Sequence, residues 1–323
     1  MAGIQSVPAL RRSRDQRLAI WAAVVPVVTA FLAVGLLGLY RYVNNYWLYR
    51  GFSPPQDPAW VKQQGTQEII SITSAAIGGR SEDTYVYLPP GYAQRPTKRY
   101  PVIYLLHGFP GGQPSAFLLT ARVGVVEDTL IAQGLMKPAI IVMPHGSTGF
   151  FSDEEWVNGI RPNEGWETFV ARDVVKAIDS RYRTIRSGYA RAIGGLSAGG
   201  YGAINIAFHH PREFRVIESW SGYELAQHVP RVFGTDTRRM AHNSPAQFLQ
   251  KVAKKLRRGH TFIWAYSGIM DPLRFQNRTF FETLAQDRID HQFFIVGGGH
   301  NWRVWRSNAR EAILVAAARL RHA

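Results

Sequence analysis

The sequence contains no cysteine. This absence excludes disulfide bonds, thiolate metal sites and cysteine nucleophiles together. The ten histidines are scattered without the helical spacing of metal ligands, so we expect no bound metal and no cofactor. Any catalysis must therefore use oxygen nucleophiles and imidazole. The lack of cysteine leaves the cellular compartment open, because an exported protein can do without disulfides.

Acidic residues are also few. The chain has 38 Lys and Arg against 23 Asp and Glu, which gives a net charge of +15. Such a charge can serve nucleic-acid binding, but the cations are spread along the chain and no nucleic-acid-binding motif accompanies them. We therefore expect no nucleic-acid partner. The excess charge instead favours a basic surface that faces anionic lipid headgroups or an acidic cell envelope.

One long hydrophobic run is present near the N-terminus. Residues 18–40 carry no charge, and at about 1.5 Å per residue a helix of this length spans the roughly 30 Å hydrocarbon core of a membrane. Trp21 and Tyr40 lie near its two ends, where interfacial aromatic residues are common. Four arginines precede the run: Arg11, Arg12, Arg14 and Arg17. This charge bias predicts a cytoplasmic N-terminus and an extracytoplasmic body, in a single-pass protein of the cytoplasmic membrane.

Two alternatives exist for this run. A cleaved signal peptide usually has an apolar stretch of only about 7 to 15 residues and a small-residue cleavage site, which is not evident here. A buried core helix is rarely apolar on every face over such a length. The sequence therefore predicts four segments: a basic N-terminus (1–17), a transmembrane anchor (18–40), a linker (41–65) and a catalytic domain (66–323).

The part of the chain that follows the anchor is long enough for one large domain. Apolar or β-branched runs bounded by turn residues predict strands at 68–77, 83–90, 100–108, 138–146, 190–200, 214–223, 260–271 and 291–300. The early runs follow one another closely, whereas helical patterns separate the later ones. This order predicts an α/β fold with a mixed, mostly parallel sheet and helices on both faces. Ligands bind such sheets beyond the carboxyl ends of the parallel strands.

Residues 195–199 read GLSAG, a G-x-S-x-G pattern that follows an apolar run and opens a helical segment. In a nucleophile elbow the chain turns sharply from strand to helix, and small residues must flank the serine to avoid a clash. The alternative is a serine that only caps a helix. The strand before it and the helix after it favour Ser197 as the nucleophile.

The glycine-rich stretch 107–112 (HGFPGG) closes another strand. A bend of this kind commonly supplies one oxyanion-hole donor, and the residue after the nucleophile supplies the other. We therefore expect the backbone N–H groups of Phe109 and Ala198 to form the oxyanion hole. A plain glycine turn is the alternative. We expect His107 itself to be structural.

The base and the acid must follow the serine in the chain order serine, acid, histidine. His300 comes late, after the last strand and a glycine turn, and is the predicted base. Asp271 ends the preceding strand and is the predicted acid, although an Asp followed by Pro is also a good helix cap. The alternative acids are Asp236, Asp287 and Asp290.

Together these motifs resemble the esterase branch of the α/β hydrolases, which includes feruloyl esterases, S-formylglutathione hydrolases and secreted mycolyltransferases. The resemblance covers roughly residues 66–320 and is carried by LLHGFPGG, WETFVARDVVKAIDSRYRT, IGGLSAGGYGA, YSGIMDPL and GGGHNWRVWR. It implies an α/β-hydrolase fold and the triad Ser197, Asp271 and His300. His107 and Asp271 differ from the residues that mycolyltransferases carry, so the resemblance favours general ester chemistry over mycolyl transfer.

The sequence thus predicts a membrane-anchored serine esterase that cleaves carboxylic esters of acylated small molecules, sugars or lipids. An acyltransferase, a peptidase and a noncatalytic envelope-binding protein with the same fold are the alternatives. Segments 147–165 and 222–243 follow strand ends and are expected to shape the substrate site. Their aromatic residues, and one beside the predicted base, are candidates for contact with substrate, with core packing as the alternative: Trp156, Tyr223 and Trp302.

Overall fold

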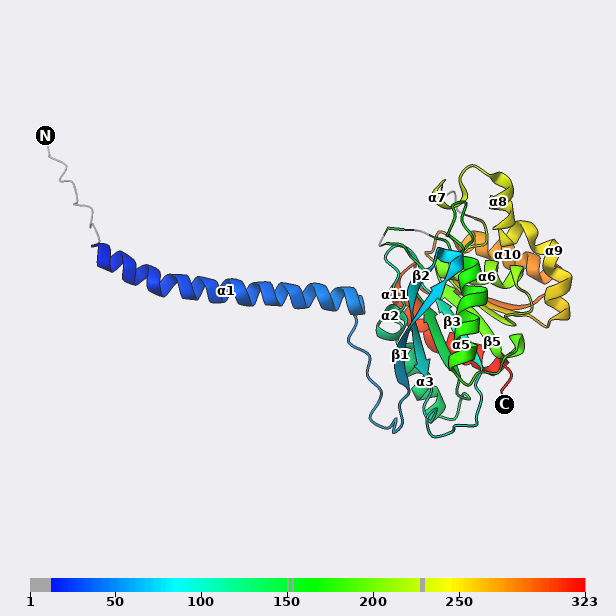
Figure 1. Cartoon of the computed structure of the whole chain (residues 1–323), viewed down its shortest axis with the longest axis horizontal. Helices are drawn as coiled ribbons and strands as arrows, with labels where there is room; N and C mark the ends of the chain where they lie inside the picture. The colour runs from blue at the N-terminus through cyan, green and yellow to red at the C-terminus, as the bar shows by residue number, and fades with distance from the viewer. Residues whose placement is uncertain (1–12, 150, 153, 227–229, 323) are drawn as a thin grey trace. The chain divides into compact units, whose positions relative to one another are not determined.

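The chain divides into two units, Met1–Phe52 and Ser53–Ala323 (Figure 1). The computed structural model describes residues 13–149, 151–152, 154–226 and 230–322. Residues 1–12, which belong to the predicted basic N-terminal segment and include Arg11 and Arg12, lie outside the described residues.

In the described part of the first unit there is one long helix, α1 (Arg14–Tyr49). Ser13 begins it with a capping box, in which its side chain accepts a hydrogen bond from the N–H of Gln16 and the Gln16 side chain accepts one from the Ser13 N–H. Between Arg14 and Tyr46 the most apolar window has a mean hydropathy of 2.4, and none of it is buried in the protein. The helix is therefore long and apolar enough to cross a membrane, as the sequence predicts, although a signal sequence has the same properties.

In the second unit the strands form an eight-stranded sheet in the order β1-β2-β4-β3-β5-β6-β7-β8. Their bounds are β1 (Thr66–Ser74), β2 (Arg80–Leu88), β3 (Val102–Leu106), β4 (Ile140–Pro144), β5 (Arg191–Leu196), β6 (Val216–Trp220), β7 (Phe262–Gly268) and β8 (Asp290–Val296). The pairs β1–β2 and β2–β4 are antiparallel, and every other pair is parallel. The mixed, mostly parallel sheet predicted from the sequence is confirmed.

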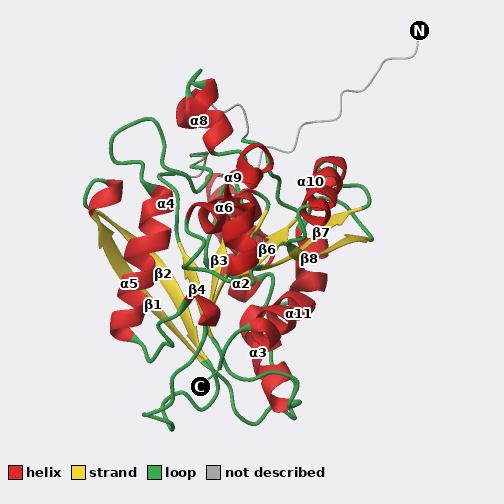
Figure 2. Cartoon of the chain, turned by 90° about the vertical axis from the view of Figure 1, so that its right-hand side faces the viewer, coloured by secondary structure: helices red, strands yellow, loops and turns green. Residues whose placement is uncertain are grey.

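Helices cover both faces of this sheet (Figure 2). One face packs against α2 (Ser115–Leu119), α3 (Val123–Ala132) and α11 (Trp302–Arg319). The other packs against α4 (Trp166–Thr168), α5 (Val175–Arg181), α6 (Ala198–His209), α9 (Pro245–Arg258) and α10 (Arg274–Gln286). Shorter elements are α7 (Pro230–Phe233), α8 (Thr237–His242), the π-helical segment Phe169–Val174 and the single turns Ala75–Ile77 and Gly188–Ala190.

The central strand β3 shows why these sequences form such a sheet. Val102, Tyr104 and Leu106 enter the core on one face, and Ile103 and Leu105 enter the core on the other. Each side chain is at most 1% exposed. Because helices bury both faces, every position of the strand must be apolar, and the period-two pattern of a half-exposed strand disappears.

Candidate active site

Ser197 lies at the turn between β5 and α6, with φ 55° and ψ −122°. This conformation is strained for a residue with a side chain, and the flanking strand and helix hold it in place. The Ser197 N–H donates a hydrogen bond to the carbonyl of Trp220 at 3.0 Å, which ties the turn to the end of β6. The turn presents the serine at the carboxyl end of a parallel strand, which is the geometry of a nucleophile elbow.

Glycines make this turn sterically feasible. A Cβ atom at Gly199 would collide with the carbonyl of Leu106, and a Cβ atom at Gly195 would collide with the same carbonyl and with Gly199. A Cβ atom at Gly108 would lie 3.2 Å from the Cβ of Ser197 and 2.8 Å from a methyl group of Leu196. The G-x-S-x-G pattern thus reflects close contacts between the elbow and β3.

His300 lies between β8 and α11, beside the serine. Its Nε2 is 2.8 Å from Ser197 Oγ, and its Nδ1 is 2.9 Å from Asp271 Oδ2. The next residue, Asn301, caps α11 with its side chain. The Trp305 ring meets the imidazole edge-on at 5.1 Å between centroids. The helix cap and the tryptophan therefore fix the orientation of the imidazole.

Asp271 follows β7 and its side chain is completely buried. Burial would raise the pKa of Asp271, but the hydrogen bond from His300 and that from the Leu273 N–H outweigh it and hold this pKa below its usual range. The carboxylate is therefore ionised at neutral pH. It favours the His300 tautomer with the proton on Nδ1, which leaves Nε2 free to accept the proton of the Ser197 hydroxyl.

The alternative that Asp271 caps a helix corresponds to a backbone hydrogen bond in the structure. Its Oδ1 accepts the N–H of Leu273 at 2.9 Å, although α10 itself begins at Arg274. One oxygen stabilises the turn and the other holds His300. The alternative acids have other partners: Asp236 caps α8, Asp287 accepts from Gln250, and Asp290 pairs with Arg319.

A cavity of about 10 Å³ lies next to the elbow and includes Phe109 and Ala198 in its wall. This volume accommodates one water-sized group. The two residues predicted to provide the oxyanion donors therefore border a space that fits a single oxygen atom.

His107 forms one wall of this cavity and is 5% exposed. Burial is the main cause that lowers the pKa of His107 to about 3, so the ring is neutral. Its Nδ1 is 3.1 Å from the carbonyl of Gly108, and its Nε2 accepts the N–H of Gly146 at 3.0 Å. His107 thus connects the loops that follow β3 and β4, as expected of a structural residue.

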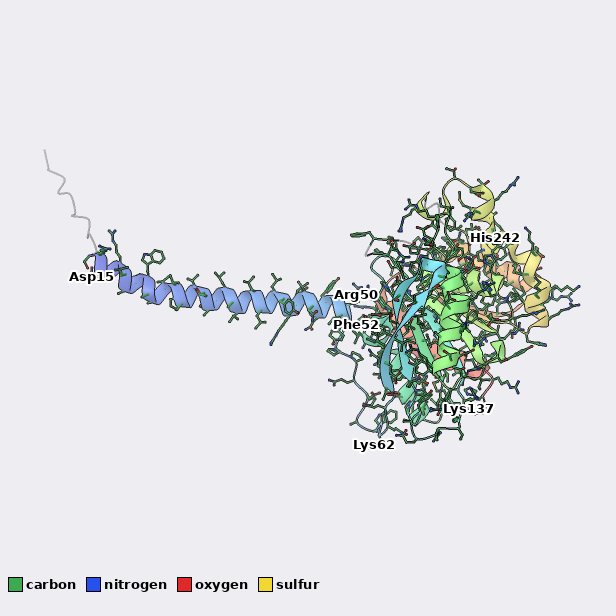
Figure 3. All side chains as sticks on the ribbon, in the orientation of Figure 1. Asp15, Arg50, Phe52, Lys62, Lys137 and His242 are labelled. Atoms are coloured by element: carbon green, nitrogen blue, oxygen red, sulfur yellow. The ribbon has the colours of Figure 1, made fainter. Side chains whose placement is uncertain are left out.

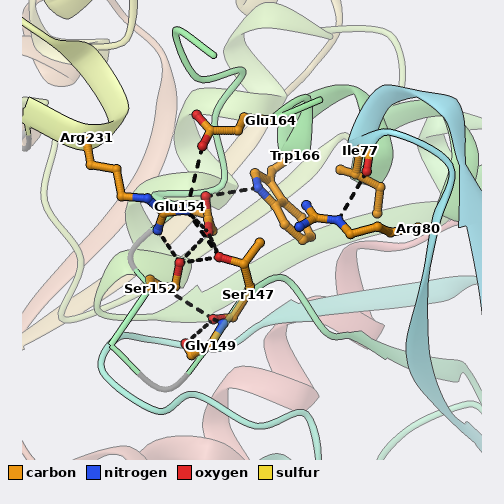
Figure 4. Close-up of polar contacts among 10 residues, drawn as sticks. Ile77, Arg80, Ser147, Gly149, Ser152, Glu154, Glu164, Trp166 and Arg231 are labelled. Carbon is orange, nitrogen blue, oxygen red and sulfur yellow. Dashed lines mark hydrogen bonds and ion pairs between the residues drawn. The ribbon is translucent and has the colours of Figure 1, made fainter. Parts of the chain in front are cut away.

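Two acidic residues in the cavity wall, Glu154 and Glu155, were not singled out from the sequence. They are 4% and 3% exposed. Glu154 accepts hydrogen bonds from Trp166 Nε1 at 3.1 Å and from Thr148 Oγ1 at 2.7 Å, and pairs with Arg231 at 3.2 Å (Figure 4). The signal available in the sequence was the run of three acidic residues at 153–155 inside the aromatic stretch 150–156, which fits a surface loop equally well.

Glu154 carries a negative charge beside the cavity. Burial would raise its pKa, but hydrogen bonds from Ser152 and Thr148 and the charge of Arg231 outweigh it and hold the pKa of Glu154 below its usual range. Arg231 belongs to α7 and also lies 3.6 Å from Glu164 (Figure 4). The arginine therefore joins α7 to the loop that borders the cavity.

The predicted substrate contacts Trp156 and Tyr223 are only 3% and 6% exposed. Trp156 lines the cavity, and its Nε1 donates to the carbonyl of His107 at 2.9 Å. Tyr223 stacks on Tyr201 at 4.7 Å and donates its hydroxyl hydrogen to Glu155. Both rings support the walls of the site, and contact with substrate stays a prediction for each.

Trp302 is partly buried two residues after His300. Its ring meets that of Trp305 edge-on at 5.2 Å, and Trp305 is the ring that contacts the His300 imidazole. Its contact with substrate also stays a prediction.

A strained serine at a strand-to-helix turn, linked through histidine to a buried aspartate on a mostly parallel sheet, is the arrangement of the α/β-hydrolase class. A family model described as "Putative esterase" matches residues 74–313, and the chain belongs to that family. The resemblance to the esterase branch is confirmed.

Several known proteins are similar to this chain. An uncharacterized protein of Corynebacterium glutamicum is 27% identical in an alignment 266 residues long, which covers 74% of this chain and 60% of that protein. An esterase of Mycobacterium tuberculosis is 34% identical over 138 residues, 42% of this chain and 28% of that protein. The solved structure of a ferulic acid esterase has a TM-score of 0.70 at 26% identity and covers 80% of this chain and 100% of its own. The chain thus spans less than two thirds of the length of these two curated relatives.

Proposed function

We propose that this chain hydrolyses carboxylic esters through Ser197, His300 and Asp271. The observation that carries the proposal is the unbroken set of hydrogen bonds from Ser197 Oγ through both nitrogens of His300 to Asp271. A serine hydroxyl is a weak nucleophile at its ordinary pKa, and an adjacent oriented base activates it.

In the proposed mechanism, His300 Nε2 takes the proton as Ser197 Oγ forms a bond to the ester carbonyl carbon. The tetrahedral intermediate collapses when the bond to the alcohol oxygen breaks, and His300 gives its proton to that oxygen. Water then attacks the acyl-enzyme, its proton passes to His300, and the acid leaves as Ser197 regains a hydrogen. Asp271 stabilises the imidazolium that forms in each half.

The negative charge of the tetrahedral oxygen would lie in the small cavity beside the elbow. The backbone N–H groups of Phe109 and Ala198 are the proposed donors, because both residues border a space that fits one oxygen. Preorganised donors of this kind typically contribute about 2.7–4 kcal/mol each to the stabilisation of the transition state.

The proposed substrates are carboxylic esters of acylated small molecules, sugars or lipids. Glu154 does not narrow this range. Its charge is balanced by Arg231, and neighbouring side chains already donate hydrogen bonds to both of its carboxylate oxygens. Acyl transfer to a second alcohol remains the alternative outcome of the same acyl-enzyme.

A panel of p-nitrophenyl esters from acetyl to palmitoyl tests this function. We expect release of p-nitrophenol, with a dependence on chain length that defines the acyl site. Adding a sugar acceptor separates the two outcomes, because an acyltransferase forms an acyl-sugar and a hydrolase forms the free acid. No turnover of any ester, together with no labelling by a fluorophosphonate, would indicate the noncatalytic alternative.

We also propose that α1 anchors the chain in the cytoplasmic membrane with the body outside. The support is its length, its long uncharged apolar run and the arginines that precede residue 18. A reporter enzyme fused after Ala323 and active only outside the cytoplasm is the expected result. Activity of a reporter that works only in the cytoplasm would reverse the orientation, and a mature N-terminus near residue 41 would show cleavage instead.

A further inference from the structure

Much of the positive charge of the chain lies far from the proposed active site. Residues 237–270 contain seven Lys and Arg and no Asp or Glu, although basic residues occur along the whole sequence. Five of the seven belong to α9: Lys251, Lys254, Lys255, Arg257 and Arg258. Ester hydrolysis through Ser197 gives these cations no role.

The spacing of these residues places like charges side by side. Lys251 and Lys255, and likewise Lys254 and Arg258, are four residues apart on the same helix and therefore repel each other. The opposite face of α9 is buried through Phe248, so the cations cannot turn inward. The ion pairs of the described residues do not include Lys251, Lys255 or Arg258. The helix thus presents a charged row that nothing in the described chain neutralises.

The row borders a groove. A hollow of about 600 Å³ is lined by Arg212, Arg215, Lys255 and Arg258. It adjoins a second hollow of about 570 Å³, with which it shares Lys255. We call these two neighbouring hollows together the basic groove. Figure 1 shows α9 next to α8 and α10, on the side of the body away from β1.

One cation of the groove is fixed in position. Arg215 Nη1 donates to the carbonyl of Pro211 at 2.6 Å, and its guanidinium lies over the Tyr189 ring at 4.8 Å. Its Nε is buried and has no partner among the described residues. A cation held in place before a ligand arrives loses little conformational freedom on binding.

The other polar groups of the groove do not cancel its charge. Glu213 is its acidic residue, and it already pairs with Arg191 at 2.8 Å. His209 is held by Glu167 at 2.8 Å and stacks on His242 at 4.4 Å; His242, labelled in Figure 3, lies on the same side of the body. The groove therefore remains available to an external anion.

The groove is separate from the proposed active site. Ser197 precedes the first residue of α6 and His209 is the last, so this helix of 12 residues separates them by about 18 Å. A ligand in the groove leaves Ser197, His300 and the small cavity accessible.

We propose that the basic groove binds the phosphate-bearing headgroup of an anionic phospholipid. Guanidinium and ammonium groups are the usual protein partners of phosphate, and a membrane surface neutralises a whole row of exposed cations at once. A lipid is chosen over a soluble phosphate because the same chain carries a helix long and apolar enough to enter a membrane.

The test uses the full chain in lipid nanodiscs and measures amide hydrogen exchange. One disc contains phosphatidylcholine only, and the other contains phosphatidylcholine with phosphatidylglycerol. The groove variant is Lys251→Gln/Lys255→Gln/Arg258→Gln. The matched control removes the same number of exposed cations elsewhere, as Lys62→Gln/Arg172→Gln/Arg310→Gln. Neither variant touches the proposed catalytic residues, so ester turnover serves as the check of folding.

We expect the unchanged chain to show slower exchange in residues 209–215 and 251–258 only in discs that contain phosphatidylglycerol. The groove variant should lose this protection, and the control variant should keep it. Each Lys or Arg near an anionic surface contributes about a fivefold gain in affinity, so three substitutions should weaken binding on the order of a hundredfold. Equal exchange in the two discs, or protection that survives in the groove variant, would overturn the proposal. Protection by inorganic phosphate in phosphatidylcholine discs would overturn the lipid assignment and indicate a soluble phosphate ligand.

Discussion

At the scale of single residues, Asp271 illustrates how one side chain serves both structure and chemistry. Its Oδ1 accepts a backbone N–H in the turn before α10, while its Oδ2 accepts the Nδ1–H of His300. The two roles make different predictions, because loss of the turn contact affects stability and loss of the charge affects the base.

Asp271→Asn should separate these roles. The amide keeps the shape and part of the turn contact, but it neither stabilises an imidazolium nor enforces the correct tautomer of His300. The same change of the triad aspartate in a serine protease lowers turnover by about 10⁴, and we expect a decrease in the same direction here. Turnover of p-nitrophenyl acetate and the thermal unfolding midpoint are the measurements. Near-normal turnover with a small loss of stability would remove Asp271 from the triad.

The motifs explain which site residues the sequence could reveal. Ser197 lies in a glycine-flanked turn, and His300 lies in a glycine-rich loop late in the chain. Both surroundings leave a local pattern in the sequence, so both residues could be predicted from it. Glu154 and Glu155 are brought to the cavity by the path of a long loop and by contact with Arg231 of α7. Contacts between distant segments depend on tertiary structure, so no local pattern distinguished them from ordinary surface acids.

At the scale of elements, the elbow depends on close approach of α6 to β3. A methyl group at position 199 would collide with the carbonyl of Leu106. To relieve this collision the backbones of two packed elements would have to move apart, which costs free energy because it disrupts their packing. The same contact makes the region predictable, because a strand, a glycine turn and a helix follow directly in the sequence.

Gly199→Ala should therefore destabilise the body by roughly 1–3 kcal/mol, the usual cost of overpacking, and should lower turnover as the serine shifts. Gly149→Ala is the control, since the nearest atom to an added Cβ there lies 4.0 Å away. Chemical denaturation and ester turnover measure the two effects. Equal stability of the two variants would show that the elbow tolerates a side chain.

For the N-terminal helix, the sequence pattern predicts that the helix exists but not where it begins and ends. The apolar run predicts 18–40, whereas α1 runs from Arg14 to Tyr49. Hydropathy marks only the part that fits a bilayer core. The capping box at Ser13 begins the helix earlier, and residues 41–49 contain no proline or glycine to end it.

At the scale of the whole molecule, the body should fold without α1. A chain that starts at Ser53 keeps Val61, which is 6% exposed, and the N–H of Gly65, which donates to Asp128 at 3.1 Å. We expect a cooperative thermal transition and full ester turnover without detergent. A chain that starts at Thr66 loses both contacts and should unfold at a lower temperature. Failure of the Ser53 chain to fold would make α1 part of the folding unit.

Buried carboxyl groups predict how stability varies with pH. Burial raises the pKa of Glu218 and of Glu224 to about 8, from 4.5. A carboxyl group whose pKa is higher in the folded than in the unfolded state favours the fold while it is protonated. This stabilisation is complete below pH 4.5, the pKa in the unfolded chain, and it is lost as the pH rises to about 8. For Glu167, burial alone would raise the pKa, but hydrogen bonds from His209 and His210 lower it to about 2, so its contribution is lost as the pH falls from 4.5.

The thermal midpoint should therefore be highest in mildly acidic buffer. Among the described residues, neither carboxyl oxygen of Glu224 has a hydrogen-bond partner, so Glu224→Gln should raise the free energy of unfolding at pH 8 by on the order of 1–3 kcal/mol. Exposed Glu311→Gln is the control and should change little. A midpoint that rises steadily from pH 5 to pH 8 would contradict this assignment.

The most direct test of the central proposal is the activity of purified Ser197→Ala beside the unchanged chain, each also treated with a fluorophosphonate. We predict that the unchanged chain hydrolyses p-nitrophenyl esters and carries the label on Ser197. Ser197→Ala should lose several orders of magnitude of turnover and all labelling, while its unfolding temperature stays nearly the same. Near-normal turnover by Ser197→Ala would contradict the proposal that this serine is the nucleophile.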